Sequence, residues 1–517
     1  MIVTRSPAPL HDPLASRARS SGGRLALVDR ADGIRWSWRD LDAAAEVAAG
    51  QLASLGVRRG DRVALFQPAG APFAAVLHGC LRLGAVLVPL PPWAPGPEGR
   101  AALGATAPRL VLAGPAGLAA AVAAAGGPAA PPVIGLAGAQ GPDGRLEDAP
   151  VRPAPERGIA AGSDCCLLRT SGTSGVPKVV RLTLANHRAS AVGCQQSLAL
   201  TGADHWLLTL APHHVGGLAV LFRSVILGQP VTTVPRFEEG AVVDALRAER
   251  PTVVSLVPTM LHRLVDAGGT EAGAIVRVIL LGGAPAPPAT VARWAATGLP
   301  VCPSYGLTES CSQVTTVPPG LAAAHPGSAG WPHGRARLTI LPDGVDPAAA
   351  PGRDHPPRAG PGEAGRIVIA GPVVSPGYLT SGPPPTRRRG PLVTGDRGRL
   401  LADGSLEVLG RADDALLTGG ELVQPEEVEM VLRSHPAVAD AAVVGEADPV
   451  WGTTLLGLVV APAATPEELV AWCRARLASA KVPRRVRLVA ALPRSEGGKL
   501  QRRALGALAG PGELSSR

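Results

Sequence analysis

The sequence predicts an α/β protein, with a large N-terminal domain of parallel-type sheets covered by helices and a small α+β C-terminal domain. Three observations support this fold class. The chain has 517 residues, which are too many for one hydrophobic core. Short apolar runs alternate with segments of helical periodicity through the first four hundred residues. The last hundred residues change in character and contain two strand-like runs close together.

The alternation of strands and helices is clearest in three stretches. Residues 62–67 (RVALFQ) predict a strand, residues 71–84 a helix, and residues 85–92 the next strand. The same order recurs in residues 251–268 and again in residues 276–306. Strand, turn, helix and strand in this rhythm are typical of parallel sheets whose faces are covered by helices.

The C-terminal domain begins where charged and glycine residues interrupt this pattern. Residues 438–462 predict two strands around a loop, and residues 465–480 predict a helix with Thr465 as its N-cap. We therefore expect three parts: an N-terminal core at 1–409, a boundary segment at 410–414 and a C-terminal domain at 415–517.

The composition favours a protein of a reducing compartment. Seven cysteines, an odd number without paired spacing, predict buried free thiols. The first residues contain no apolar signal core, and no apolar run reaches the ~18 residues of a membrane span. We expect a cytoplasmic protein without membrane insertion, and the sequence leaves its oligomeric state open.

The positive charge of the chain has two interpretations. A net charge of +9 and a pI near 9.7 are compatible with nucleic-acid binding. However, the basic residues are scattered, and their one run, Arg387–Arg389, lies in a Pro/Gly-rich segment. We therefore predict a solvated basic surface and no nucleic-acid partner. A basic, non-catalytic binding protein is the alternative.

Lysine is rare in this chain, which makes each lysine informative. Of the 50 basic residues only three are lysines: Lys178, Lys481 and Lys499. Arginine serves wherever a generic positive charge is enough. The remaining lysines are candidates for positions that need a compact point charge on a flexible stem, such as a contact with phosphate.

Lys178 ends a segment rich in glycine and hydroxyl residues, LLRTSGTSGVPKVVRLT at residues 167–183. Backbone N–H groups of a tight glycine loop can point at phosphate oxygens, and the hydroxyls and the lysine add further donors. The segment is not a Walker A loop, because no Gly-Lys-Ser/Thr run is present. We predict a phosphate-binding loop formed by Thr170, Ser171, Gly172, Thr173, Ser174, Gly175 and Lys178.

This loop resembles the phosphate loop of the adenylate-forming superfamily, which includes acyl-CoA synthetases, peptide-synthetase adenylation domains and luciferases. The family pattern is T-S-G-T-T-G-x-P-K-G, so Ser174 and Val179 depart from it. Four further matches follow in the family's order: SYGLTES (304–310), VTGDRG (393–398), GRADDALLTGGELVQPEEVE (410–429) and PRSEGGKLQRR (493–503). The segment before VTGD, usually aromatic in the family, reads RRRGPL here.

The resemblance implies an acid–thiol ligase that joins a carboxylate to the α-phosphate of ATP and then transfers the acyl group to a thiol. It implies Mg²⁺ bound by Glu309, an α-phosphate contact from Thr308, and adenine flanked by Tyr305. Asp396 would accept hydrogen bonds from the ribose hydroxyls and Arg411 would add a ribose contact.

The C-terminal motifs imply a mobile domain. By resemblance, Lys499 reaches between the carboxylate and the α-phosphate during adenylation. The domain then swings about a hinge at Asp413, and the face with Gly419 and Gly420 admits the thiol. No carrier-protein module follows, so we expect free coenzyme A as the acceptor. Lys481 is assigned a structural role.

The acyl substrate is suggested by four runs, NHRASA (186–191), PHHVGGLAVLFRSVILG (212–228), LLGGAPAP (280–287) and SYGLTESCSQVTT (304–316). They resemble a branch of the family that acts on an aryl keto-acid with two carboxylates. Absence of an acidic residue from 210–228 argues against an amino acid. Candidate acyl contacts are Arg223, Ser304, Gly282 and Ser310, with His214 between the acyl pocket and the thiol tunnel.

Two questions stay open at this level. Arg223 lies in an apolar run, and a buried arginine needs a partner, which a structural ion pair or the substrate could supply. The same machinery could also act on another aryl acid or on a fatty acid, because pocket shape cannot be read from one sequence.

Overall fold

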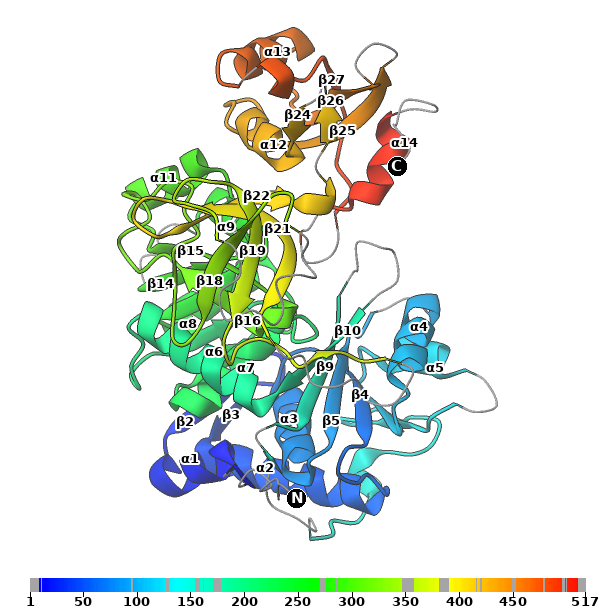
Figure 1. The fold of residues 1–517 in the computed structure, drawn as a ribbon. Helices are drawn as coiled ribbons and strands as arrows, with labels where there is room; N and C mark the ends of the chain where they lie inside the picture. The colour runs from blue at the N-terminus through cyan, green and yellow to red at the C-terminus, as the bar shows by residue number, and fades with distance from the viewer. Residues whose placement is uncertain are drawn as a thin grey trace, which may run out of the picture.

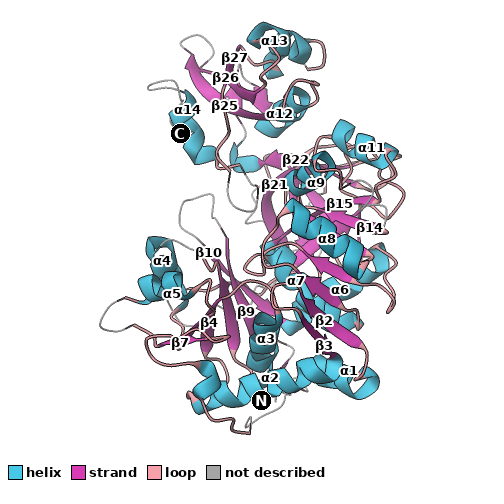
Figure 2. Cartoon of the chain, turned by 180° about the vertical axis from the view of Figure 1, so that it is seen from behind, coloured by secondary structure: helices cyan, strands magenta, loops and turns pink. Residues whose placement is uncertain are grey.

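The structure is a computed structural model with two large sheets, a smaller antiparallel sheet and a C-terminal unit (Figures 1 and 2). It describes residues 9–10, 12–93, 96–126, 130–153, 159–160, 162–170, 178–269, 276–284, 286–345, 358–380, 390–414, 416–418, 421–448, 452–477, 479–494, 498 and 500–509. The mixed α/β architecture confirms the predicted fold class.

The first sheet lies in the N-terminal half and is mostly parallel. Over the described residues its order is β20 (Gly377–Tyr378), β10 (Lys178–Thr183), β9 (Asp164–Thr170), β5 (Val86–Leu90), β4 (Arg62–Phe66), β6 (Leu110–Ala113) and β7 (Val133–Gly135). The pairs β20–β10 and β10–β9 are antiparallel, and the other pairs of this sheet are parallel. The predicted strands at 62–67 and 85–92 are β4 and β5, and the predicted helix at 71–84 is α3 (Ala71–Leu83).

The second sheet contains the strands of the later repeats. In the described ranges its order is β17 (Trp331–Pro332), β16 (Ser312–Thr316), β15 (Val301–Leu307), β14 (Val278–Leu281), β13 (Val253–Leu256), β11 (Trp206–Leu208), β12 (Val231–Thr233), β2 (Leu25–Asp29) and β3 (Ile34–Ser37). The six strands from β15 to β2 in this order are parallel, as the rhythm of the sequence predicted.

Helices cover both large sheets and follow the strands along the chain (Figure 2). They are α1 (Pro13–Ser21), α2 (Trp38–Ser54), α4 (Gly96–Thr106), α5 (Leu118–Ala125), α6 (Leu184–Ser197), α7 (Val215–Leu227), α8 (Glu239–Glu249), α9 (Pro258–Asp266) and α11 (Pro288–Ala296). Capping boxes begin α2 at Ser37 and α6 at Thr183, where each cap hydroxyl accepts from the N–H three residues on. Short 3-10 turns are η1 (Leu146–Asp148) and η2 (Thr308–Ser310).

A third sheet differs from the predicted parallel type. It is antiparallel throughout and consists, where the chain is described, of β18 (Arg337–Pro342), β19 (Gly365–Ala370), β21 (Leu392–Leu400) and β22 (Leu406–Arg411). The sequence between these strands contains no helix in its described parts, so neighbouring strands can pair directly. Two short antiparallel pairs also occur. They are β1 (Pro9–Leu10) with β8 (Ile159–Ala160) and β23 (Leu416–Thr418) with β24 (Glu421–Val423).

The C-terminal unit stands above the body of the molecule in Figure 1 and has hydrophobic clusters of its own. It contains β25 (Asp440–Asp448), β26 (Gly452–Val460), β27 (Arg485–Leu488), α12 (Pro425–Arg433), α13 (Pro466–Arg474), α14 (Gly506–Ala509), η4 (Ala412–Asp414), η5 (Ser479–Lys481) and η6 (Arg502–Leu505). The two strands predicted at 438–462 are β25 and β26, and Thr465 caps α13 as expected. This helix ends at Arg474, earlier than the predicted residue 480, and a 3-10 turn follows.

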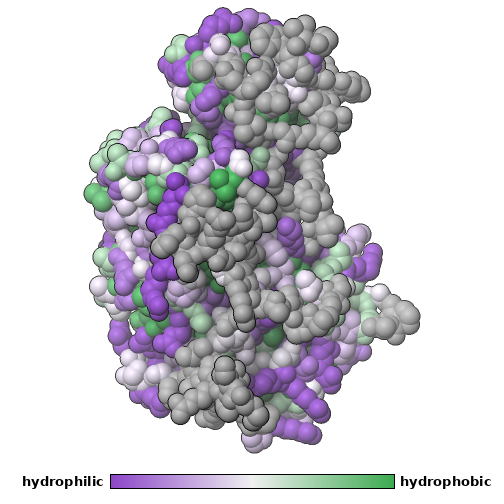
Figure 3. Space-filling model, viewed as in Figure 1, coloured by the Kyte–Doolittle hydropathy of each residue, from purple (hydrophilic) through white to green (hydrophobic). Residues whose placement is uncertain are grey.

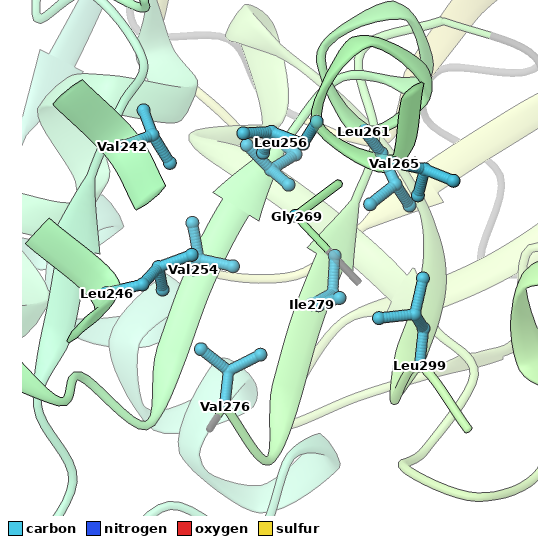
Figure 4. A pocket seen from close by; sticks show the side chains of 11 residues that line it. Val242, Leu246, Val254, Leu256, Leu261, Val265, Gly269, Val276, Ile279 and Leu299 are labelled. Carbon is cyan, nitrogen blue, oxygen red and sulfur yellow. The ribbon is translucent and has the colours of Figure 1, made fainter. Parts of the chain in front are cut away.

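Apolar side chains of the two large sheets and their helices form the main core. All seven cysteines are buried and free, which confirms the prediction from their spacing. Between α8, α9, β13 and β14 lies a small apolar cavity of about 20 Å³ (Figure 4). Its walls are Val242, Leu246, Val254, Leu256, Leu261, Leu264, Val265, Gly269, Val276, Ile279 and Leu299, which offer no hydrogen-bonding side chain.

The surface is polar and mixed in character. On the face seen in Figure 3, hydrophilic residues are spread over the described surface with smaller hydrophobic areas between them. None of the helices in the described ranges has both the length and the apolar character that crossing a bilayer requires.

Candidate active site

The predicted phosphate loop connects two antiparallel strands. Thr170 at the end of β9 pairs with Lys178 at the start of β10, so residues 171–177 join the two strands. Ser171, Gly172, Thr173, Ser174 and Gly175 lie outside the described residues. Val179, which replaces the family glycine, is buried in the core beneath the first sheet. Its N-terminal neighbour Lys178 is exposed, because successive side chains of a strand point to opposite faces.

Lys178 and Glu309 both contact Tyr378, the lysine over its ring and the carboxylate at its hydroxyl. The Lys178 Nζ atom is 5.2 Å from the centre of the Tyr378 ring, a cation–π distance. The Tyr378 hydroxyl donates a hydrogen bond of 2.8 Å to Glu309 Oε1. Strand register explains this, since β20 pairs Tyr378 with Val180 of β10. A lysine and a carboxylate from distant motifs are thereby brought to one place.

The turn with Thr308 and Glu309 is fixed by backbone hydrogen bonds. The buried Ser310 hydroxyl accepts from the Leu307 N–H at 3.0 Å and contacts the Leu307 and Ser312 carbonyls. The Glu309 carbonyl accepts from the Ser375 N–H at 2.8 Å, next to the strand of Tyr378. Ser310 thus holds the turn that presents Glu309, and its predicted contact with the acyl substrate stays a prediction.

Tyr305, Asp396 and Arg411 meet at one carboxylate. The Tyr305 hydroxyl donates to Asp396 Oδ2 at 2.7 Å, and Arg411 Nη1 lies 3.0 Å from Asp396 Oδ1. Asp396 and Arg411 are direct neighbours across β21 and β22. Burial and the charge of Asp396 raise the pKa of Tyr305 well above its usual value, so the phenol stays protonated and donates. Each carboxylate oxygen has one further lone pair that can accept a hydrogen bond.

The predicted acyl residues Gly282 and Ser304 are in contact. The Ser304 hydroxyl donates to the Leu281 carbonyl at 3.0 Å, and a Cβ atom on Gly282 would lie 2.8 Å from Ser304 Oγ. Gly283 follows with a φ of +80°, and a Cβ atom there would lie 3.2 Å from Cγ1 of Val257, the residue before α9. These residues lie at the carboxyl ends of β14 and β13, where ligands commonly bind in parallel sheets.

Arg223 is buried within α7, with 1% of its surface exposed, and it has no carboxylate in ion-pair distance among the described residues. Its Nη2 atom donates to Gln313 Oε1 at 2.6 Å and to Ser312 Oγ at 3.1 Å. The register of β15 and β16 places Gln313 opposite Gly306, two residues from Ser304. The structural ion pair that the sequence left possible for Arg223 is therefore absent from the described structure.

Histidines near Arg223 are neutral at ordinary pH. Burial and, secondarily, the Arg223 charge lower the pKa of His187 to about 3 and that of His333 to about 4. His187 stacks on Phe222, and its Nδ1 is 3.3 Å from Cys311 Sγ. The positive charge of Arg223 is thus surrounded by uncharged side chains.

His214 is the N-cap residue of α7 and lies beside the ring of His213. Its ring centre is 4.5 Å from that of His213, which meets Trp93 edge-on at 5.8 Å. Burial, followed by the effect of His214, lowers the pKa of His213 to about 3. The sequence motifs gave no reason to select Trp93, because it lies after β5 in a Pro-rich segment far from any motif.

The C-terminal motifs meet the core at Gly498 and Gln424. A Cβ atom on Gly498 would lie 2.6 Å from Thr259 Oγ1 and 3.6 Å from Val257 Cγ2. Gln424, with its amide oriented to suit both neighbours, donates to the Arg411 carbonyl at 2.9 Å. Lys499, Gly419, Gly420 and the side chain of Asp413 lie outside the described structure. The residue before Lys499 nevertheless lies beside Val257, the neighbour of Gly283.

Charged pairs also fix the segments around the predicted hinge. Asp414, directly after Asp413, has its carboxylate 3.1 Å from Arg502 Nε. Lys481 donates to Glu427 Oε1 of α12 at 2.7 Å, in agreement with the structural role assigned to it. Tyr378 and Trp93 are the neighbours of the site that lie outside the quoted motifs. Tyr378 alone had a signal, as one of only two tyrosines in the chain.

The family of the chain follows from comparison with known proteins. The model of the AMP-binding enzyme family matches residues 14–379, and the model of the AMP-binding enzyme C-terminal domain matches residues 427–499. The first match covers more than half of the sequence. The chain belongs to the AMP-binding enzyme family, as the predicted resemblance to adenylate-forming enzymes implied.

Individual relatives indicate which members of the family this chain is similar to. The chain is 36% identical to the 2-succinylbenzoate–CoA ligase of Geobacillus kaustophilus over 511 residues, which are 95% of this chain and 96% of that protein. It matches o-succinylbenzoate CoA synthetase (MenE) from Bacillus subtilis in complex with the acyl-adenylate intermediate OSB-AMP with a TM-score of 0.83 and 31% identity, over 96% of this chain and 98% of the other. The same synthetase in complex with ATP and magnesium ion matches with a TM-score of 0.81 and 31% identity, over 96% and 100%.

Proposed function

We propose that the protein is an ATP-dependent 2-succinylbenzoate–CoA ligase, which adenylates one carboxylate of the acid and then forms the thioester with coenzyme A. The single structural observation that supports 2-succinylbenzoate as the substrate is the environment of Arg223. A buried guanidinium with only neutral partners in the described structure lacks an opposite charge, which a substrate carboxylate would supply. Relatives named for this dicarboxylic acid support the same reading.

The nucleotide would bind beside the carboxylates of Asp396 and Glu309. Asp396 would accept from the ribose hydroxyls with Arg411 beside it, and Tyr305 would flank the adenine. The phosphate chain would then lie along the hairpin of β9 and β10, near Lys178. Thr308, in the turn next to Glu309, would contact the α-phosphate.

Glu309 suits a magnesium ion. Mg²⁺ prefers carboxylate oxygens and keeps several waters and phosphate oxygens, so one protein carboxylate is enough. Tyr378 holds one Glu309 oxygen and orients the group. When bound, the ion would neutralise phosphate charge while the acid approaches.

Lys499 would supply the remaining charge between the acid and the α-phosphate. Gly282 and Ser304 would line the reacting end of the acid, and Arg223 would neutralise its second carboxylate. After adenylation the C-terminal domain would turn at Asp413, and the Gly419–Gly420 face would admit the thiol past His214. Ser310 and the loop residues Ser171 to Gly175 keep the roles predicted from sequence. As predicted from the sequence, we propose that the enzyme acts in the cytoplasm.

Mass spectrometry of the products tests the proposal. The protein is incubated with ATP, Mg²⁺, coenzyme A and a mixture of 2-succinylbenzoate, benzoates and fatty acids, alongside Lys499→Ala. We expect 2-succinylbenzoyl-CoA to dominate, and the variant to lose it. If another acyl-CoA dominates, the protein is still a CoA ligase, but 2-succinylbenzoate is not its preferred substrate. No acyl-adenylate or thioester from any acid would support a non-catalytic protein on this fold.

A further inference from the structure

The segment that contains Lys499 is closed at its base by backbone contacts. Arg494 and Leu500 form an isolated antiparallel bridge, and the Gln501 N–H donates to the Pro493 carbonyl at 2.9 Å. Both ends of the segment are therefore fixed to each other. Contacts from the side can then hold the described residues of this segment further.

Arg494 holds this segment with a guanidinium that is itself fixed. Its Nε and Nη2 atoms form a bidentate pair with Asp440, at 2.8 Å to Oδ2 and 2.6 Å to Oδ1. Its remaining nitrogen, Nη1, donates to the Gly498 carbonyl at 2.6 Å. A planar guanidinium with one edge occupied presents its other donor in a fixed direction. Asp440 is rigidly placed, because it begins β25, which pairs with β26 along its whole length.

Among the described residues of this segment, Gly498 contacts the N-terminal core. Its φ of +73° favours glycine, and a Cβ atom there would lie 2.6 Å from Thr259 Oγ1. Thr259 is in the first turn of α9, next to Val257, which borders Gly283 of the predicted acyl site. The carbonyl that Arg494 holds therefore belongs to the residue that contacts the core and directly precedes Lys499.

We propose that Arg494, fixed by Asp440, is a positioning residue for Lys499 in the adenylation step. The proposal rests on the function proposed above. A misplacement of about 1 Å in a catalytic group can cost about 100-fold in rate, so loss of this contact acts on the step that uses the lysine. Thioester formation follows after the lysine has left the site. The Asp440–Arg494–Gly498 contacts lie wholly within the C-terminal domain and have no part in that second step.

Two half-reaction assays test the proposal with the full-length protein. The first measures acyl-adenylate formation from acid and ATP in a single turnover, and the second measures thioester formation from supplied acyl-adenylate and coenzyme A. Arg494→Gln and Asp440→Asn are expected to slow the first by about 10- to 100-fold and to change the second less than about twofold, within ordinary additivity error. The double variant is expected to be no slower than Arg494→Gln, because both changes break one unit.

Arg485→Gln is the matched control. Arg485 forms a bidentate pair with Glu446 in the same three-stranded sheet, away from Gly498. We expect it to leave both half-reactions unchanged. Arg494→Lys keeps the charge but cannot bind Asp440 and the Gly498 carbonyl at the same time. If the glutamine variant folds poorly, the lysine variant should likewise slow acyl-adenylate formation and leave thioester formation unchanged.

The outcomes separate this proposal from the proposed function. An Arg494→Gln enzyme that adenylates at the wild-type rate, or loses both half-reactions equally with a lower unfolding temperature, overturns the positioning role and leaves the ligase intact. A wild-type protein that adenylates no acid in the mixture overturns the ligase and the positioning role together.

Discussion

The Tyr378 hydroxyl donates to Glu309 Oε1 at 2.8 Å, while the same ring lies 5.2 Å from Lys178 Nζ. One side chain thereby links the lysine after the phosphate loop to the carboxylate proposed for Mg²⁺. The ring is fixed in turn by the pairing of β20 with β10.

Tyr378→Phe is expected to weaken the response to magnesium. The variant keeps the ring and loses one hydrogen bond to a charged group, worth about 1.5–3 kcal/mol, so the Mg²⁺ concentration for half-maximal activity should rise about tenfold or more. The measurement is acid-dependent exchange of pyrophosphate into ATP over a magnesium titration.

The other tyrosine of the chain is the control for this experiment. Tyr305→Phe removes a similar hydrogen bond, but to Asp396 at the proposed ribose site. It should raise the KM for ATP and leave the magnesium dependence unchanged. Equal magnesium curves for the two variants would contradict the separate roles of the two tyrosines.

Arg223→Gln should reduce substrate binding without destabilising the fold. Removing a buried charge that lacks a charged partner is often neutral or stabilising, so the unfolding temperature should stay equal or rise. The KM for 2-succinylbenzoate should rise about tenfold or more, the value of one charged hydrogen bond, and turnover of a monocarboxylic benzoate should not fall. Unfolding by heat and steady-state kinetics with both acids measure the two effects.

Arg82 provides the contrast. It is equally buried but pairs with Asp12, Asp42 and Glu46, so Arg82→Gln leaves carboxylates without their partner. A loss of about 3 kcal/mol or more in the free energy of unfolding is expected. If Arg223→Gln destabilises as much as Arg82→Gln, then Arg223 is a structural residue.

Acid should destabilise the protein through its buried histidines. Burial lowers the pKa of His333 to about 4, below the ordinary 6.5, and neither ring nitrogen has a partner in the described structure. Between these two values the unfolded chain binds the proton first, so this contribution to stability is complete above pH 6.5 and is lost as pH falls. At pH 5 one such histidine costs about 2 kcal/mol relative to pH 7.

The variant His333→Leu isolates this contribution. Because leucine does not titrate, the free energy of unfolding should fall less between pH 7 and pH 5 than in the wild type. Urea unfolding at both pH values gives the comparison. An equal fall in the two proteins would show that His333 already binds its proton in the folded state.

The sequence predicted several strands and helices correctly because the patterns that define them are local. β4, α3 and β5 follow directly from alternating apolar and amphipathic runs. Relations between distant segments could not be predicted in this way. Tyr378 reaches Glu309 only because β20 is added at the edge of the first sheet. Likewise, Arg494 holds Gly498 because Asp440, 54 residues earlier, begins the neighbouring strand.

The last prediction concerns the space between Gly282 and Ser304. A methyl group at Gly282 would lie 2.8 Å from Ser304 Oγ, and the hydroxyl is held by the Leu281 carbonyl. Gly282→Ala should therefore displace Ser304 and raise the KM for the acid about tenfold, since overpacking typically costs about 1–3 kcal/mol. Steady-state kinetics with the acid as the varied substrate measure the change.

The double variant Gly282→Ala/Ser304→Ala tests whether displacement of Ser304 causes the rise in KM. Removing the hydroxyl restores the space for the methyl group, so the double variant should bind the acid better than Gly282→Ala alone. Such a positive coupling is expected only for side chains in direct contact. If the double variant is worse than either single variant, then Gly282 is required by the substrate itself and not by Ser304.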